Sequence, residues 1–135
     1  KMGDRVSIQF QDSDGDKSPV LFHHWGGMHL PKFASNWIKS FREKLNIQDN
    51  VSDPITRMEA RSLIVQFIAD LKRYKDFHEC VGFEKDEEGK SIYNIPIYSN
   101  DLVSHSLYLG KSEYDGDNSD NGHWVIDTNT GEFVE

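Results

Sequence analysis

The chain contains one cysteine, Cys80, in 135 residues. A single thiol cannot form an internal disulfide or build a cysteine-based zinc site, and this scarcity is typical of proteins from a reducing cytoplasm. No apolar run is as long as a membrane span, and the first residues lack the apolar stretch of a secretory signal. We therefore expect a cytoplasmic protein without a membrane segment. Lys1 in front of Met2 resembles a residue left from an expression tag, with Met2 as the natural start.

Positive charge is also scarce, because 15 Lys and Arg residues stand against 23 Asp and Glu residues and give a net charge of -8. The average field around such a molecule repels phosphate groups. We therefore expect a small molecule or another protein as the partner, not nucleic acid or a membrane surface. The chain has 36% hydrophobic and 12% aromatic residues, and its length suffices for a buried core. Residues 1–135 are predicted to form a single folded domain.

The N-terminal part predicts two strands followed by a helix. Polar and apolar residues alternate over residues 5–10, which predicts a half-buried strand with Val6, Ile8 and Phe10 on its apolar face. Residues 11–17 have the Asp and Gly content of a tight turn, and residues 20–25 predict a more central strand. Apolar residues then recur every three or four positions, as in an amphipathic helix; they are Leu30, Phe33, Trp37, Ile38, Phe41 and Leu45.

A second, longer helix is predicted to begin at Asp53 and Pro54, because Asp is a favoured N-cap and Pro a favoured first helical residue. Its apolar pattern continues to about residue 77. A loose hairpin at residues 81–98 and strands at residues 104–110, 123–127 and 132–134 are predicted to follow. This order predicts an α+β fold, in which one mostly antiparallel sheet has two helices packed on one face.

The C-terminal half is rich in aromatic residues with a polar tip: Tyr93, Tyr98, Tyr108, Tyr114 and Trp124. Such rings form either a binding surface or the outer rim of a core. Large aromatic side chains are buried more often than not. We therefore assign these rings to the rim of the core.

The densest polar stretch, residues 113–123, combines Asp, Asn and Ser side chains with glycine between two predicted strands. Its length exceeds what a hairpin requires, which suggests a role. Alternating oxygen ligands around glycine are typical of calcium loops, but the glutamate at the twelfth position of an EF-hand is missing. Two interpretations remain. The stretch is either a solvated turn, which we favour, or an irregular calcium or magnesium site completed by Asp12, Asp14 and Asp16.

Three histidines lie within residues 23–29, in the stretch His-His-Trp-Gly-Gly-Met-His. Two imidazoles and a carboxylate suit zinc or another divalent metal with an open position for water. The candidate metal ligands are His24, His29, His123, Asp115 and Asp117. In the other interpretation, the histidines pack as amphipathic side chains, and Gly26 and Gly27 only turn the chain from strand to helix.

Four motifs occur together: Met-Gly-Asp-Arg at residues 2–5, His-Trp-Gly-Gly at 24–27, Tyr-Leu-Gly at 108–110, and Gly-Asp-Asn-Ser-Asp-Asn-Gly-His at 116–123. With them the chain resembles a group of short uncharacterised prokaryotic, archaeal and phage proteins that begin with a similar strand. The resemblance covers both ends of the chain and leaves residues 46–105 unmatched. It implies no activity, but it directs attention to the His-Trp-Gly-Gly turn and the acidic loop.

The leading hypothesis is a small-ligand or protein-binding module that uses the end of the sheet where this turn and this loop meet. Its candidate binding residues are Trp25, Gly26, Gly27, Asp117, Asp120 and His123. The first alternative is a metal-dependent hydrolase, with His24, His29, His123 and Asp117 or Asp120 around an activated water. The second is a phage-type inhibitor of a host protein. A homodimer is compatible with the predicted edge strand. Both site-based hypotheses require the turn and the loop to be neighbours.

Overall fold

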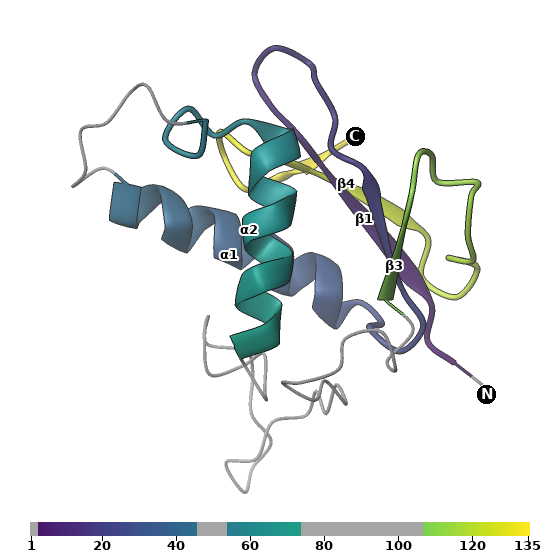
Figure 1. Cartoon of the computed structure of the whole chain (residues 1–135). Coiled ribbons are helices and arrows are strands. Elements are labelled where there is room, and N and C mark those ends of the chain that lie inside the picture. Colours follow the sequence, from purple (N-terminus) through teal and green to yellow (C-terminus); the bar gives the residue numbers. More distant parts are fainter. Residues whose placement is uncertain (1–2, 46–53, 74–106) are drawn as a thin grey trace, which may run out of the picture.

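The structure of the protein, a computed structural model, describes residues 3–45, 54–73 and 107–135 (Figure 1). Five strands form one sheet, and two helices cover one of its faces. The elements, in chain order, are β1 (Val6–Gln11), β2 (Val20–His23), α1 (His29–Leu45), α2 (Ala60–Arg73), β3 (Leu107–Gly110), β4 (His123–Asp127) and β5 (Phe133–Val134). The predicted α+β class with helices on one face of a sheet is confirmed.

The strand order across the sheet is β3-β2-β1-β4-β5, so β1 lies at its centre. β1 pairs antiparallel with β2 and parallel with β4, in a register that joins Ser7 to His123 and Gln11 to Asp127. The other two pairings, β2 with β3 and β4 with β5, are antiparallel. The sheet is therefore mostly antiparallel, as predicted, with one parallel pair at its middle.

The central strand is buried on both faces, so the prediction of a half-buried strand is wrong for β1. Val6, Ile8 and Phe10 have no exposed surface and belong to the core beneath the helices. On the opposite face, Ser7 is also fully buried and Gln9 is 7% exposed. Alternation revealed which side chains share a face, but it could not show that a second layer covers the polar face.

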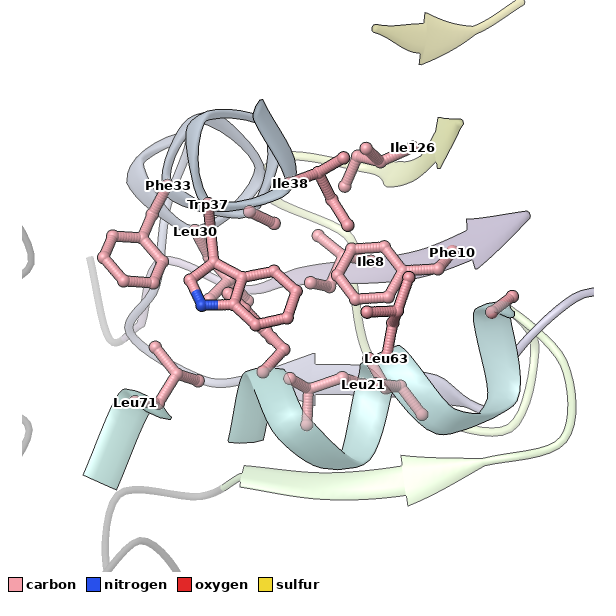
Figure 2. Close-up of a cluster of buried hydrophobic side chains, with 14 of the residues drawn as sticks. Ile8, Phe10, Leu21, Leu30, Phe33, Trp37, Ile38, Leu63, Leu71 and Ile126 are labelled. Carbon is pink, nitrogen blue, oxygen red and sulfur yellow. The ribbon is translucent and has the colours of Figure 1, made fainter. Parts of the chain in front are cut away.

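Apolar side chains from β1 and both helices meet in the core (Figure 2). The ring of Phe10 lies parallel to Trp37 of α1, with centroids 6.1 Å apart, and edge-on to Phe67 of α2 at 5.6 Å. Burial of each such ring stabilises the fold by about 1.5–3 kcal/mol. The indole Nε1 of Trp37 also donates a hydrogen bond to Asp70 Oδ2 at 2.8 Å, which links α1 to α2.

α1 follows the predicted apolar spacing, with Leu30, Phe33, Trp37 and Ile38 all buried. α2 does not begin where the local sequence indicated. Residues 54–58 form a turn, Met58 adopts a left-handed backbone with φ of 58°, and the helix starts at Ala60. Pro54 is therefore not the first helical residue, and Asp53 lies outside the described residues.

The cap of α2 comes from the distant β1–β2 hairpin. Asp12 Oδ2 accepts a hydrogen bond from the amide of Ala60 at 3.0 Å. Its other oxygen, Oδ1, accepts hydrogen bonds from the amides of Asp14 and Asp16, each at 3.1 Å. One carboxylate thus closes the hairpin and satisfies an otherwise orphaned helix amide. Asp12 is occupied by the fold, which removes it from a metal site with the acidic loop.

Among the later predicted strands, Leu107–Gly110, His123–Asp127 and Phe133–Val134 are present. The predicted hairpin at residues 81–98, residues 104–106 and Cys80 lie outside the described residues. Within residues 3–45, 54–73 and 107–135, no helix combines the length and apolar character that a membrane crossing needs.

Replacing Asp12 by Ala should lower the free energy of unfolding by about 0.5–2 kcal/mol, because the α2 amide and the hairpin amides lose their acceptor. Urea denaturation monitored by circular dichroism measures this change. The exposed neighbour Asp14 is the matched control, and Asp14→Ala should change the free energy by less than about 0.5 kcal/mol. Equal effects of the two substitutions would show that charge in the hairpin, not the cap, is responsible.

Candidate functional site

The acidic loop is a connection that crosses the sheet. β3 is antiparallel to β2, which is antiparallel to β1, so β3 and β4 both run parallel to β1. Because β2 and β1 lie between β3 and β4, residues 111–122 must cross both strands to reach the start of β4. Figure 1 shows this segment, in green, on the side of the sheet away from the helices. We call residues 111–122 the crossover, and its path explains its length.

Close packing against the edge of the sheet holds the middle of the crossover. Tyr108 of β3 stacks on Phe22 of β2, with ring centroids 4.9 Å apart. Gly116 lies against both rings, and a Cβ atom there would be 2.6 Å from Tyr108 and 2.8 Å from Phe22. The Tyr108 hydroxyl accepts a hydrogen bond from the amide of Asp117 at 3.0 Å. Glycine at position 116 therefore permits an approach that no side chain would allow.

His123 lies beneath the crossover at the start of β4. Its Nδ1 is 2.7 Å from Ser7 Oγ, and its Nε2 is 3.2 Å from Gln9 Oε1 and 3.6 Å from Glu113 Oε2. Burial lowers the pKa of His123 below its ordinary value of 6.5, although the Glu113 carboxylate acts in the opposite direction. The predicted binding residue His123 is thus engaged inside the protein.

Ser7, His123 and Glu113 are the residue types of a nucleophilic triad, but their arrangement does not suit nucleophilic catalysis. Ser7 has no exposed surface. Its hydroxyl also accepts a hydrogen bond from the Asn118 side chain at 2.9 Å, which closes it off from the crossover side. A nucleophile must reach a substrate atom, so this group acts as a structural polar cluster.

The His-Trp-Gly-Gly turn and the crossover are neighbours, with residues 3–5 between them. On one side, the amide of Gly27 donates a hydrogen bond to the carbonyl of Asp4 at 2.8 Å. On the other side, the amide of Asn121 donates to the carbonyl of Arg5 at 3.0 Å, and the Asn121 side chain donates to Asp4 Oδ1 at 2.7 Å. The spatial condition on which the sequence hypotheses depend is fulfilled at this end of the sheet.

Arg5 engages two of the loop aspartates that the sequence offered as ligands. Its Nε is 3.1 Å from Asp117 Oδ2, and its Nη1 is 3.2 Å from Asp120 Oδ2. Hydrogen bonds from the side chain and amide of Ser119, together with Arg5, lower the pKa of Asp117. Asp115 accepts hydrogen bonds from the amides of Lys111 and Ser112, which lower its pKa as well. These carboxylates stabilise the bends of the crossover.

The predicted metal ligands do not gather in one place. The ring of His24 lies edge-on to Trp25 with centroids 4.7 Å apart, His29 begins α1, and His123 lies under the crossover. In the part of the chain that the structure describes, no three His, Cys, Asp or Glu side chains are grouped to hold a metal ion. The hypothesis of a metal centre therefore gains no geometric support from these residues.

Two of the predicted binding residues are packing positions. Gly26 is buried, and a Cβ atom there would lie 3.1 Å from Val6 and Leu30. Gly27 has a left-handed φ of 55°, and its Cβ would meet the Asp4 carboxylate at 2.5 Å. They turn the chain into α1, as the second interpretation of this stretch stated. Trp25, in contrast, is 42% exposed and remains available to a partner.

Three large side chains are exposed where β3 leads into the crossover. Tyr108 is 42%, Leu109 56% and Tyr114 86% exposed, and we call these three residues the β3 surface. The assignment to the rim of the core is therefore wrong for Tyr114, whereas Tyr108 stacks on the buried ring of Phe22 and Trp124 packs against the core, as expected. Local spacing could not reveal this difference, because only the tertiary structure makes β3 the outermost strand among the described residues.

Comparisons with protein-family models, curated proteins and solved structures found no match to this chain.

Removing the hydroxyl of Tyr108 should loosen the crossover. Tyr108→Phe keeps the ring on Phe22 but leaves the Asp117 amide without its acceptor, so the free energy of unfolding should fall by about 0.5–1.5 kcal/mol. Tyr114→Phe removes a hydroxyl from a ring that is 86% exposed and should have almost no effect. Urea denaturation of both variants provides the comparison, and equal stabilities would show that the hydroxyl of Tyr108 does not anchor the crossover.

The start of α1 should make the protein sensitive to acid. Burial lowers the pKa of His29 from 6.5 to about 4, against the opposing effect of Asp4. The folded pKa is the lower one, so this stabilisation is complete above pH 6.5 and is lost as the pH falls towards 4. Relative to His29→Gln, the wild type should lose about 1–2 kcal/mol more between pH 7 and pH 4.5. Urea denaturation of both proteins at the two pH values measures this difference. An equal loss of stability in the wild type and in His29→Gln would contradict the prediction.

Proposed function

We propose that this chain is a binding module that docks another protein through the β3 surface. The observation that carries the proposal is the exposure of Tyr108, Leu109 and Tyr114 on and just after β3, the outermost strand of the sheet among the described residues. The hydrogen bonds from Lys111 and Ser112 to Asp115 fold the chain back directly after β3, which keeps Tyr114 near the end of that strand. Tyr108 and Leu109, as consecutive strand residues, face opposite sides of β3, and Tyr114 lies just beyond its end, so the three side chains surround this strand.

The chemistry of these side chains suits a protein interface. Tyrosine is enriched where proteins meet, because its ring offers a large contact area with few rotatable bonds and its hydroxyl can still donate or accept a hydrogen bond. A lone exposed leucine is common on any surface. An exposed leucine on a short outer strand that also exposes a tyrosine is less common and favours contact with a partner along that strand.

The charge around the β3 surface indicates which partner fits. Glu113, Asp115 and Asp117 follow Tyr108 in the crossover, with Lys111 as the one basic residue between Tyr108 and Asp117. The whole chain has a net charge of -8. Complementary charge accelerates encounter and suppresses wrong partners. We therefore infer a partner protein with a basic surface around an apolar contact, in the cytoplasm.

The alternatives have weaker support. A metal-dependent hydrolase would need ligands that converge, and no such group occurs within residues 3–45, 54–73 and 107–135. A small-ligand site at the glycine turn would have only Trp25 as an exposed contact among its four residues, because Gly26 and Gly27 are packed against the fold and His24 lies against Trp25. A phage-type inhibitor of a host protein is a special case of the proposed function and would use the same surface.

The test compares the wild type with Leu109→Ser/Tyr114→Ser and with the control Val65→Ser. Val65 is 66% exposed on α2, so the control removes a similar apolar group elsewhere. Each protein is immobilised and incubated with lysate of the source organism, and bound proteins are quantified by mass spectrometry. We expect a basic protein that the wild type and the control retain equally and that the double variant retains at least about tenfold less, a loss of about 1.4 kcal/mol.

Two results would contradict this proposal. The first is equal retention by the double variant, provided that circular dichroism shows it to be folded. The second is a wild type that elutes in size-exclusion chromatography as a dimer of the 15.6 kDa chain, while the double variant elutes as a monomer. In that case the β3 surface joins two copies of this protein.

A further inference from the structure

Gln9 fixes the donor-to-acceptor direction of a chain of hydrogen bonds beneath the crossover. The side-chain Nε2 of Gln9 donates a hydrogen bond to the carbonyl of Ser18 at 2.8 Å. A carbonyl can only accept, so the Gln9 amide must present its nitrogen to Ser18 and its oxygen to His123. Gln9 is 7% exposed, and it therefore has little freedom to turn to water instead.

The orientation of Gln9 determines the protonation of His123. Gln9 Oε1 lies 3.2 Å from His123 Nε2 and can only accept, so Nε2 must carry the hydrogen. In a neutral ring Nδ1 is then an acceptor, and the Ser7 hydroxyl donates to it across 2.7 Å. Ser7 Oγ in turn accepts from Asn118 Nδ2 at 2.9 Å. At every contact from Asn118 to Ser18, the donor and the acceptor are thus determined.

A protonated ring would disrupt this chain. Its Nδ1 would also carry a hydrogen and would face the hydroxyl hydrogen of Ser7. Ser7 could not turn that hydrogen towards Asn118, because the Asn118 amide already donates to it. The hydroxyl would lose its acceptor in a fully buried position, and the link between the crossover and β1 would weaken.

We propose that the hydrogen-bond chain Asn118–Ser7–His123–Gln9 is a pH-sensitive latch, which holds the crossover on the sheet while His123 is neutral and releases it on mild acidification. The crossover contributes Asn118 to the latch, and the two strands beneath it contribute the other three residues. The latch is a property of the fold itself, separate from the contacts that a partner would make.

The groups that face His123 are consistent with release of the crossover in acid. β1 contributes only the neutral side chains of Ser7 and Gln9. The crossover contributes Glu113, which favours the protonated ring from 3.6 Å, and Lys17 in the β1–β2 hairpin disfavours it. Burial is the largest effect and lowers the pKa. The pKa of the His123 ring returns to its ordinary value of 6.5 when the crossover opens. Opening therefore becomes more favourable as the pH falls below 6.5.

Release of the crossover would also affect the β3 surface, since Tyr114 lies on the crossover and Tyr108 is bonded to it. Partner binding should then weaken in acid. This last step rests on the proposed function, whereas the latch itself does not.

Amide hydrogen exchange of the full chain tests the latch without any partner. The amides of Asp117 and Asn121, which donate to the Tyr108 hydroxyl and to the carbonyl of Arg5, report opening of the crossover. After correction for intrinsic exchange, their protection in the wild type should fall by up to about tenfold per pH unit below 6.5. His123→Gln offers a neutral acceptor and donor at similar positions and should abolish this dependence. His24→Gln, outside the latch, should retain it.

Protection that stays constant between pH 7 and pH 5 in the wild type, or that falls equally in His123→Gln, would overturn the latch. If His123→Gln does not fold, nitrogen NMR of the wild-type imidazole decides. The latch requires a neutral ring with hydrogen on Nε2 at pH 6.5, and hydrogen on Nδ1 would contradict it. None of these measurements uses a partner, so failure of the latch and failure of the proposed function are distinguishable.

Discussion

The parallel pairing of β1 with β4 is the constraint on which the rest of the structure depends. It places β3 and β4 in the same direction on opposite sides of the β2–β1 pair, so the chain between them must cross the sheet. The crossing adds a layer over the face that the helices leave open. β1 is therefore buried on both faces, although its polar and apolar residues alternate as in a strand with one solvent-exposed face.

Burial of a polar face requires that its groups find partners within the protein, because each buried group without one costs about 1–3 kcal/mol. The crossover meets this requirement with Asn118, and β4 meets it with His123. The same requirement explains the acidic composition of the crossover. Asp115 accepts hydrogen bonds from backbone amides, and Asp117 and Asp120 neutralise Arg5. Residues that resemble metal ligands in the sequence are thus engaged in holding an irregular segment in place.

A segment with its inner side committed to the fold still presents an outer side to solvent. In this protein the inner side carries Gly116 and Asn118, and the outer side carries Tyr114. The same segment can therefore stabilise the sheet and contact a partner. A change in the contacts on its inner side would be transmitted to the outer side through a few bonds, which is the physical basis for coupling between the latch and the β3 surface.

The sequence by itself determined the parts of the fold that depend on local spacing. The alternation in β1, the apolar stripe of α1 and the turn chemistry of the hairpin each follow from neighbours in the chain, and they suffice to predict an α+β sheet with helices on one face. The prediction that the glycine turn and the acidic loop meet also holds, with Arg5 between them.

Only the tertiary structure decided the rest, because the interactions concerned join residues far apart in the chain. The cap of α2 comes from Asp12, 48 positions from the amide that it binds, and the Asp53–Pro54 signal could not reveal it. The burial of Ser7 depends on strand order, which alternation does not encode. Local spacing fixes which side chains share a face, but only the order and direction of the strands decide what covers that face.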